Sequence, residues 1–235
     1  MPPTPMQGIL LVDKPQGWTS FDVVNYVRKQ VAGVQGTKPK NTKVGHTGTL
    51  DPLATGLLVL LIGKEYTRKA TLLSKADKTY EVTMKLGETS TTADDEGEKT
   101  VVSHTAPTQK AVLEALEGLQ GHIMQVPPAF SAMKVGGQRA YKLAREGKKV
   151  ALEARPVTIY KLQLTSYQYP YVRFTAEVGS GTYIRSLVED IGKVLGTGAY
   201  MSDLRRTKVG NFSLTASHAP DADGLMQYVF LLEAK

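Results

Sequence analysis

Residues 45–62 read GHTGTLDPLATGLLVLLI, a turn-forming stretch that leads into an apolar run. The glycines and Pro52 exclude regular structure from the first part, whereas Gly56–Ile62 has the length of one buried β-strand. Pro52 also biases Asp51 away from helical geometry, so that the carboxylate can project from the loop. A loop mounted on a core strand often carries a catalytic group. The residues alone leave two interpretations of Asp51 open, a catalytic carboxylate or an ordinary turn residue.

Short strands and helices are predicted on both sides of this loop. A turn is expected at residues 13–17, and Ser20 is expected to cap a helix that buries Phe21, Val24, Val27 and Val31. Strands are predicted at 8–12, 56–62, 79–86, 157–164, 172–178 and 209–214, and helices at 20–31, 66–76, 108–119 and 182–195. No regular βαβ alternation is present, which indicates an α+β fold with a mixed, mainly antiparallel central sheet flanked by helices.

Residues 129–154 are basic and polar and contain one short helical pattern, at 138–146. Such a segment is typical of an arm inserted into a domain rather than of a core element. We therefore expect one domain over residues 1–214, with an arm at 129–154 and a short C-terminal tail at 215–235.

Composition narrows the classes of function. The net charge of +7 fits a polyanionic partner, because a basic surface attracts phosphates, and it fits equally a basic surface without a specific partner. No apolar run approaches the ~20 residues of a membrane span, and cysteine is absent, which fits a cytoplasmic protein. Phosphate-loop and dinucleotide fingerprints are missing, and the four histidines form no ligand pair. We expect no metal and no cofactor.

The stretch GHTGTLDPLATGLL resembles the signature loop of the TruB-type pseudouridine synthases, which modify uridine 55 in the T-loop of tRNA. Five further stretches resemble motifs of that family, in the family's order. They are KPQGWTS at 14–20, KTYEV at 78–82, VPPAFSA at 126–132 with Lys134 and Tyr141, GTYIRSL at 181–187, and LRRT at 204–207 with VGNF at 209–212. The resemblance therefore covers residues 14 to 212, and it implies the pseudouridine synthase fold with an RNA-binding thumb at 129–154.

The resemblance also implies a reaction and its residues. The bond between uracil N1 and ribose C1′ breaks and the base rejoins through C5, with no redox change and no group donor. Asp51 would be the essential carboxylate, Arg185 its ion-pair partner, and Tyr80 the ring that stacks on the flipped base and helps to remove the C5 proton. Four further substrate contacts are implied, at His46, Tyr183, Leu204 and Lys14. Phosphate contacts are implied on the arm at Lys134, Arg139, Lys142, Arg145 and Lys148, with Lys38, Lys40 and Lys43 adding positive charge.

Several alternatives stay open at this point. Asp51 could attack ribose C1′, attack uracil C6, or remove a ribose proton to give a glycal. Members of the related dyskerin class act with a guide RNA, but the LATG continuation and the arm favour a stand-alone, monomeric enzyme that binds the T-arm without a guide. A tRNA-folding chaperone role could exist beside catalysis. Residues 215–235 are too few for the family's usual PUA-type RNA-binding module.

Overall fold

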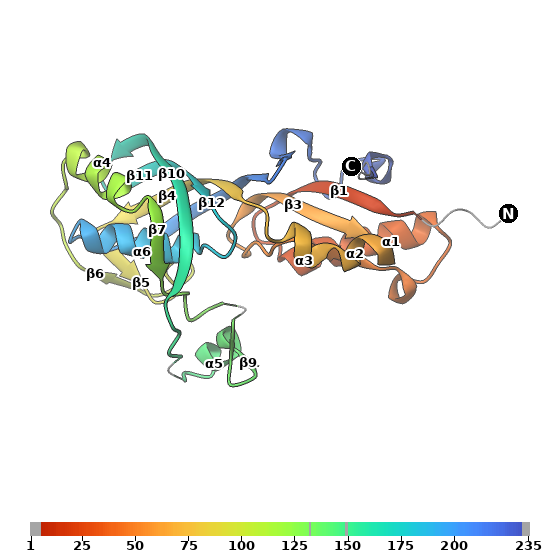
Figure 1. The fold of residues 1–235 in the computed structure, drawn as a ribbon, viewed down its shortest axis with the longest axis horizontal. Helices are drawn as coiled ribbons and strands as arrows, with labels where there is room; N and C mark the ends of the chain where they lie inside the picture. Colours follow the sequence, from red (N-terminus) through yellow and green to blue (C-terminus); the bar gives the residue numbers. More distant parts are fainter. Residues whose placement is uncertain (1–5, 132, 149, 232–235) are drawn as a thin grey trace. The chain divides into compact units, whose positions relative to one another are not determined.

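The computed structural model describes residues 6–131, 133–148 and 150–231 (Figure 1). Packing divides the chain into two compact units. One comprises Met1–Tyr80 and Arg205–Lys235, and the other comprises Glu81–Leu204. Two strands, β4 (Lys78–Leu86) and β12 (Ala199–Val209), contribute residues to both units.

The first unit is built on a sheet around β3 (Thr55–Ile62), the predicted apolar strand. β1 (Gly8–Lys14) and β2 (Val44–His46) both pair with β3 in the antiparallel sense. The last residues of β12 run parallel to β3, with Arg206 opposite Gly56, and β13 (Phe212–Ser213) then pairs back onto β12. The strand that carries the GHTGTLDPLATG loop is therefore paired on both sides.

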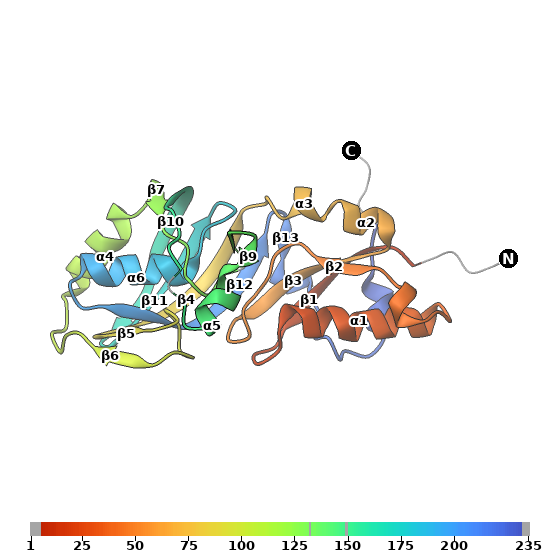
Figure 2. The same ribbon diagram turned by 90° about the horizontal axis from the view of Figure 1, so that it is seen from below.

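Helices cover both faces of this sheet. The apolar face of α1 (Ser20–Val34) packs on one side of β1 and β3, as Figure 2 shows. The other side packs against α2 (Lys64–Arg68), α3 (Ala70–Leu73) and Val209. The strand residues Gly56–Ile62 are thus apolar without alternation because both faces of β3 are buried.

The segment after residue 213 belongs to the core of the first unit. It contains two 3₁₀ turns, Leu214–Ala216 and Leu225–Tyr228, and a third such turn, Pro39–Asn41, follows α1. Main-chain hydrogen bonds join Ile9 to Phe230 and His218 to β1, while Leu225 is buried in the cluster beneath α1. The expected tail therefore covers the free edge of β1 as far as residue 231, and residues 232–235 lie outside the described part of the chain.

The second unit has the strand order β12-β4-β11-β10-β7. β11 (Tyr171–Val178), β10 (Arg155–Gln168) and β7 (Gly121–Gln125) are mutually antiparallel neighbours. α4 (Gln109–Gly118), capped by Thr108 as predicted, packs against β10 and α6 (Ile184–Val194). The α+β class with a mainly antiparallel sheet is confirmed.

Two excursions leave the sheet of the second unit. A tight acidic turn joins β5 (Glu88–Ser90) to β6 (Lys99–Val101). The segment between β7 and β10 carries the short pair β8 (Lys134–Val135) and β9 (Gln138–Arg139), followed by α5 (Ala140–Arg145) (Figure 1). This segment is the predicted arm; residues 132 and 149 within it lie outside the described part.

Some local predictions were wrong. Thr19, not Ser20, caps α1, through a capping box with Asp22. Phe21, which was expected in the core, is 60% exposed, and Val23 is buried there instead. Residues 66–76 form two short helices rather than one. β1 continues through Lys14, where a turn was expected. The single strand expected at 209–214 is divided instead: Val209 ends the longer β12, and β13 forms after a turn.

No helix within the described ranges combines the length and the apolar character of a membrane span.

Candidate active site

The GHTGTLDP loop is joined to the KPQGWTS segment by paired hydrogen bonds. The buried Ser20 hydroxyl donates to the carbonyl oxygen of Leu50 at 2.9 Å and accepts from the amide of Leu50 at 2.8 Å. The Gly17 amide donates to the carbonyl oxygen of Pro52 at 2.9 Å. These bonds hold the residues on both sides of Asp51. Two motifs that are separate in sequence thus form one structural element.

Lys14 also contacts the main chain of this loop. Its side chain is fully buried, and Nζ donates to the carbonyl oxygens of Trp18 at 2.7 Å, Pro15 at 2.9 Å and Pro52 at 3.3 Å. Burial lowers the Lys14 pKa to about 8, against the opposing influence of the Asp51 charge. All three ammonium protons point to carbonyls, so a direct contact with substrate would require Lys14 to give up one of these bonds. The predicted substrate contact stays a prediction.

Arg206 is a second buried cation at this loop, and the sequence analysis assigned it no role. Its side chain is 1% exposed. Nε donates to the Leu57 carbonyl at 2.7 Å, and the two terminal nitrogens donate to the carbonyls of Gly48 at 3.0 Å and Thr49 at 3.5 Å. The guanidinium therefore contacts the main chain both before and after Asp51.

The predicted substrate residues of the first unit lie on or beside these strands. Asp51 is half-buried, and its main-chain oxygen accepts a hydrogen bond from Ala54 at 3.1 Å that closes the turn. Tyr80 is buried on β4. His46 ends β2, and burial together with the charge of Arg206 lowers its pKa. Its Nδ1 is buried and has no hydrogen-bond partner among the described residues. Burial and the Arg206 charge therefore both favour the neutral form of the His46 imidazole.

Arg185, on α6 of the second unit, is held by the acidic turn between β5 and β6. Its guanidinium lies 3.5 Å from the Asp94 carboxylate, and both side chains are nearly inaccessible to solvent. The terminal nitrogens also donate to the main-chain oxygens of Phe130 at 2.8 Å and Thr92 at 3.2 Å. Asp94 is thus an ion-pair partner of Arg185 to which the sequence analysis assigned no role. The pairing of Arg185 with Asp51 stays a prediction.

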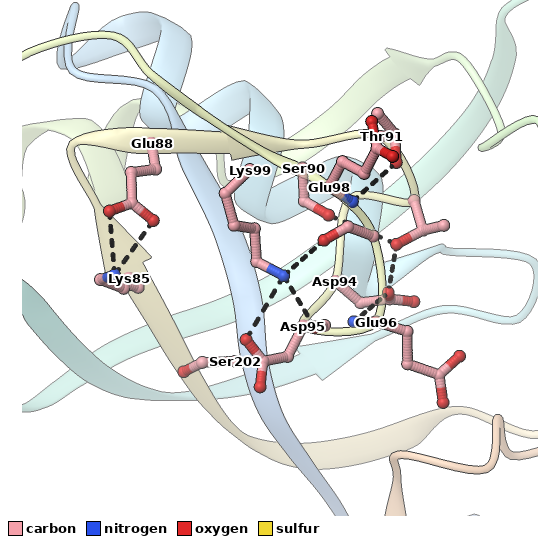
Figure 3. Close-up of polar contacts among 12 residues, drawn as sticks. Lys85, Glu88, Ser90, Thr91, Asp94, Asp95, Glu96, Glu98, Lys99 and Ser202 are labelled. Atoms are coloured by element: carbon pink, nitrogen blue, oxygen red, sulfur yellow. Dashed lines mark hydrogen bonds and ion pairs between the residues drawn. The ribbon is translucent and has the colours of Figure 1, made fainter.

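Figure 3 shows how the acidic turn presents Asp94. The carboxylate accepts hydrogen bonds from the Thr92 hydroxyl and, at 3.1 Å, from the Glu96 amide. Lys99 donates to the carbonyl oxygens of Asp95 and Gly97, both at 2.7 Å. These two bonds close the turn that contains Asp94. These contacts fix the direction of the carboxylate that faces Arg185.

The other predicted residues of the second unit lie near the start of α6 and on the arm. The side chain of buried Gln125 accepts a hydrogen bond from the Tyr183 amide at 2.9 Å and donates one to the Tyr183 carbonyl oxygen at 3.2 Å. Tyr183 also lines a pocket of about 130 Å³ with Arg155 and Ser180. Leu204 is buried on β12. Lys134 lies in β8, and four further basic residues of the arm are exposed: Arg139, Lys142, Arg145 and Lys148.

Within the described residues, no group of three or more His, Asp or Glu side chains lies together as a metal site would require.

Gly56→Ala tests how closely the loop fits against β12. Gly56 has a φ of +98°, and a Cβ there would lie 2.4 Å from the Arg206 carbonyl oxygen. We expect the substitution to lower the free energy of unfolding by about 3 kcal/mol or more, because the strained dihedral and the main-chain clash add. Urea unfolding measures this. Gly36→Ala is the control, since Gly36 also has a positive φ, of +62°, but open space around it. Equal losses in the two variants would contradict the close fit.

Lys78→Met tests the half-buried positive charge beside Arg206. Lys78 Nζ donates to the carbonyls of Ala76 at 2.6 Å and Ser74 at 3.0 Å, and burial, then the Arg206 charge, lowers the Lys78 pKa to about 8. The unfolded chain, with an ordinary lysine pKa of 10.5, binds more protons between about pH 8 and 10.5. The charged Lys78 therefore destabilises the folded state by its full amount below about pH 8, and this destabilisation decreases as the pH rises towards 10.5. We expect the stability of wild type relative to Lys78→Met to increase from pH 7.5 to 10 in urea unfolding. A constant difference would contradict the lowered pKa.

Comparison with known proteins identifies the family. The model of the "TruB family pseudouridylate synthase (N terminal domain)" matches residues 35–184, and that of the "tRNA pseudouridylate synthase B C-terminal domain" matches residues 185–233. Relatives named tRNA pseudouridine synthase B are similar over most of the chain. The one from Chlamydia abortus is 44% identical, covering 88% of this chain and 85% of its own. The one from Arthrobacter is 47% identical, with 89% and 68% covered.

Solved structures give the same result. A Cbf5–Nop10–Gar1 complex contains a chain that is 29% identical, with a TM-score of 0.66, over 90% of this chain. An H/ACA RNP bound to a substrate RNA containing 2′-deoxyuridine also matches, at 25% identity and a TM-score of 0.66. The present chain spans 52% and 58% of those two chains, respectively. By its family models, its relatives and its fold, this chain belongs to the TruB family of tRNA pseudouridine synthases, isomerases that form pseudouridine in tRNA.

Proposed function

We propose that this chain converts uridine 55 in the T-loop of tRNA to pseudouridine, with Asp51 as its essential carboxylate. The observation that carries the proposal is the loop at residues 45–56, which Ser20, Lys14 and Arg206 hold against the sheet on both sides of Asp51. A carboxylate on a loop fixed in this way needs little reorganisation before it reacts. Membership of the TruB family supplies the reaction and the substrate class.

The reaction is an isomerisation, so its atoms balance without a second substrate. The bond between N1 and C1′ breaks, the uracil turns, a bond forms between C5 and C1′, and the C5 proton leaves while N1 gains one. Asp51 acts by covalent attack or by proton abstraction, both of which require an ionised carboxylate. Extrusion of the base from its stack costs a few kcal/mol, and contacts between protein and RNA must offset this cost.

The remaining site residues receive roles that fit their surroundings. We propose that Arg185, held by Asp94 on one side, presents its charge to Asp51. Tyr80 would stack on the flipped uracil and assist loss of the C5 proton, and Tyr183 and Leu204 would line the same pocket. His46, whose neutral form is favoured by burial and by the charge of Arg206, suits stacking on the neighbouring T-loop bases.

The arm supplies the contacts to the RNA backbone. Its exposed cations can neutralise phosphates without reading sequence, and RNA loops are recognised largely by shape and by displaced bases. This assigns the T-arm of tRNA as the partner of a monomeric enzyme that needs no guide RNA. A cytoplasmic location follows from this substrate and remains part of the proposal.

Tritium release tests the assignment of the uridine. Unmodified tRNA labelled with tritium at C5 of its uridines is incubated with the purified chain, with no other RNA or protein present. We expect about one tritium to be released per tRNA, and none from a tRNA in which uridine 55 is replaced by cytidine. A T-arm hairpin should be a substrate as well.

The other outcomes separate the alternatives. Release from the cytidine-55 tRNA would move the target to another uridine. Release only after addition of cellular RNA would favour a guided enzyme. Binding of the T-arm hairpin without any release would leave a tRNA-folding role alone.

A further inference from the structure

Arg206 makes an unusual set of contacts for a fully buried guanidinium. Its hydrogen bonds go to main-chain oxygens at two places, Gly48 and Thr49 before Asp51 and Leu57 after it. Within the described residues, no carboxylate lies within 4.0 Å of it. Burial of a charge costs free energy, and here no carboxylate contact offsets that cost. A methionine of similar volume would fill the same space without this loss.

The shape of the guanidinium explains how Arg206 stabilises the conformation of the loop. The planar fork donates in fixed directions from one group, so it holds two stretches of main chain at a set separation. A lysine ammonium at the same position would have to reach both stretches from one atom, whereas the guanidinium reaches Leu57 and Gly48 from two different nitrogens.

The backbone of the same residue fixes the exit of the loop. Arg206 lies opposite Gly56 where β12 runs parallel to β3, and the approach is so close that a Cβ on Gly56 would lie 2.8 Å from the Arg206 amide nitrogen. Side chain and main chain of one residue therefore hold both ends of the stretch 48–57, which carries Asp51.

We propose that Arg206 is a positioning residue, which fixes both ends of the loop so that Asp51 presents its carboxylate in a single orientation. The inference rests on the proposed function, in which Asp51 is the reacting carboxylate. Arg206 does not touch the substrate in this proposal, and it acts only through the main chain of the loop.

Arg206→Lys tests the proposal, with Arg205→Lys as the matched control. Arg205 is the neighbouring residue on β12, but it is about one-third exposed, and its guanidinium pairs with Asp13 at 2.7 Å. On unmodified tRNA we expect Arg206→Lys to lower kcat by about 10- to 100-fold with KM nearly unchanged, because a small misplacement of a reacting group has an effect of this size. Arg205→Lys should retain both constants to within about threefold, since the charge that faces Asp13 is kept.

Hydrogen–deuterium exchange of residues 47–56 separates positioning from general destabilisation. We expect the amides of this stretch to exchange faster in Arg206→Lys, while those of β1 and α1 keep the exchange rates of wild type. If Arg206→Lys does not fold, Arg206→Met is measured in its place.

The proposal is overturned if the two lysine variants have the same kcat, if KM rises while kcat is retained, or if activity falls only in proportion to the unfolded fraction. Unchanged exchange of residues 47–56 also overturns it. If wild type releases no tritium from any tRNA, the proposed function has failed instead. The exchange measurement then still decides whether Arg206 fixes the loop, because it needs no substrate.

Discussion

Asp51→Asn is expected to lower the rate of tritium release from tRNA by at least about 10⁴-fold, equivalent to ~5.5 kcal/mol of activation free energy. Asparagine has the shape of aspartate but is neither a nucleophile of comparable strength nor a base. The turn that holds residue 51 uses main-chain groups, including the Asp51 carbonyl that accepts from Ala54, and the substitution leaves these intact. We therefore expect the variant to fold normally and to bind the T-arm with nearly unchanged affinity.

The control for this experiment is Asp223→Asn, an exposed aspartate of the same unit, which should retain full activity. Single-turnover measurements with enzyme in excess over tRNA distinguish slow chemistry from weak binding. A rate for Asp51→Asn within about tenfold of wild type would contradict the assignment of Asp51 as the essential carboxylate. Loss of T-arm binding in parallel with activity would place Asp51 in RNA recognition instead.

The central loop and its strand could be predicted from the sequence because their signals are local. Gly48 and Pro52 disfavour regular structure between β2 and β3, although Gly45, which was expected in the loop, lies in β2. An unbroken apolar run at Gly56–Ile62 indicates a strand buried on both faces. The structure places β3 at Thr55–Ile62, with α1 on one side and α2 and α3 on the other. The class of the fold followed in the same way, from the order of short strands and helices.

The supports of the loop could not be predicted, because they depend on contacts between distant residues. Arg206 bonds Leu57, which is 149 residues away in the chain, and a cation at the end of a strand is normally expected at the surface. Lys14 was expected in a turn because Pro15 and Gly17 follow it closely. β12 was missed because charged residues interrupt its apolar alternation from Asp203 onward, and the burial of Arg206 becomes evident only beside β3.

The acidic turn shows the same limit in the second unit. Residues 89–98 read TSTTADDEGE, an acidic and turn-rich stretch, and they form the turn between β5 and β6 with its flanking residues. Nothing local indicates that Asp94 is the residue that turns inward, whereas Asp95 and Glu96 remain exposed. Its contacts with Thr92, the Glu96 amide and Arg185 distinguish it. A buried ion pair therefore supports Arg185, and the sequence analysis found one of its two members.

Arg185→Lys is the second substitution with a large expected effect. The guanidinium donates in three directions, to Phe130 at 2.8 Å, to Thr92 at 3.2 Å and towards Asp94 at 3.5 Å. Lysine keeps the positive charge, but it cannot satisfy all three acceptors. We expect the free energy of unfolding to fall by about 2 kcal/mol, because charged hydrogen bonds inside the protein are worth roughly 1.5–3 kcal/mol each. The rate should fall by about 10²- to 10³-fold, as expected for a misplaced charge at a reacting carboxylate.

Two comparisons test whether the ion pair with Asp94 causes these effects. Arg173→Lys, an exposed position on β11, is the matched control and should change neither stability nor rate. Arg185→Met leaves the Asp94 carboxylate buried without its cation and should cost about 3–5 kcal/mol. Adding Asp94→Asn to Arg185→Met should return part of that loss, since the remaining uncompensated charge is removed. Additive losses in urea unfolding would show that the two side chains act independently. If the rate of Arg185→Lys is that of wild type while stability falls, the role of Arg185 is confined to holding the acidic turn.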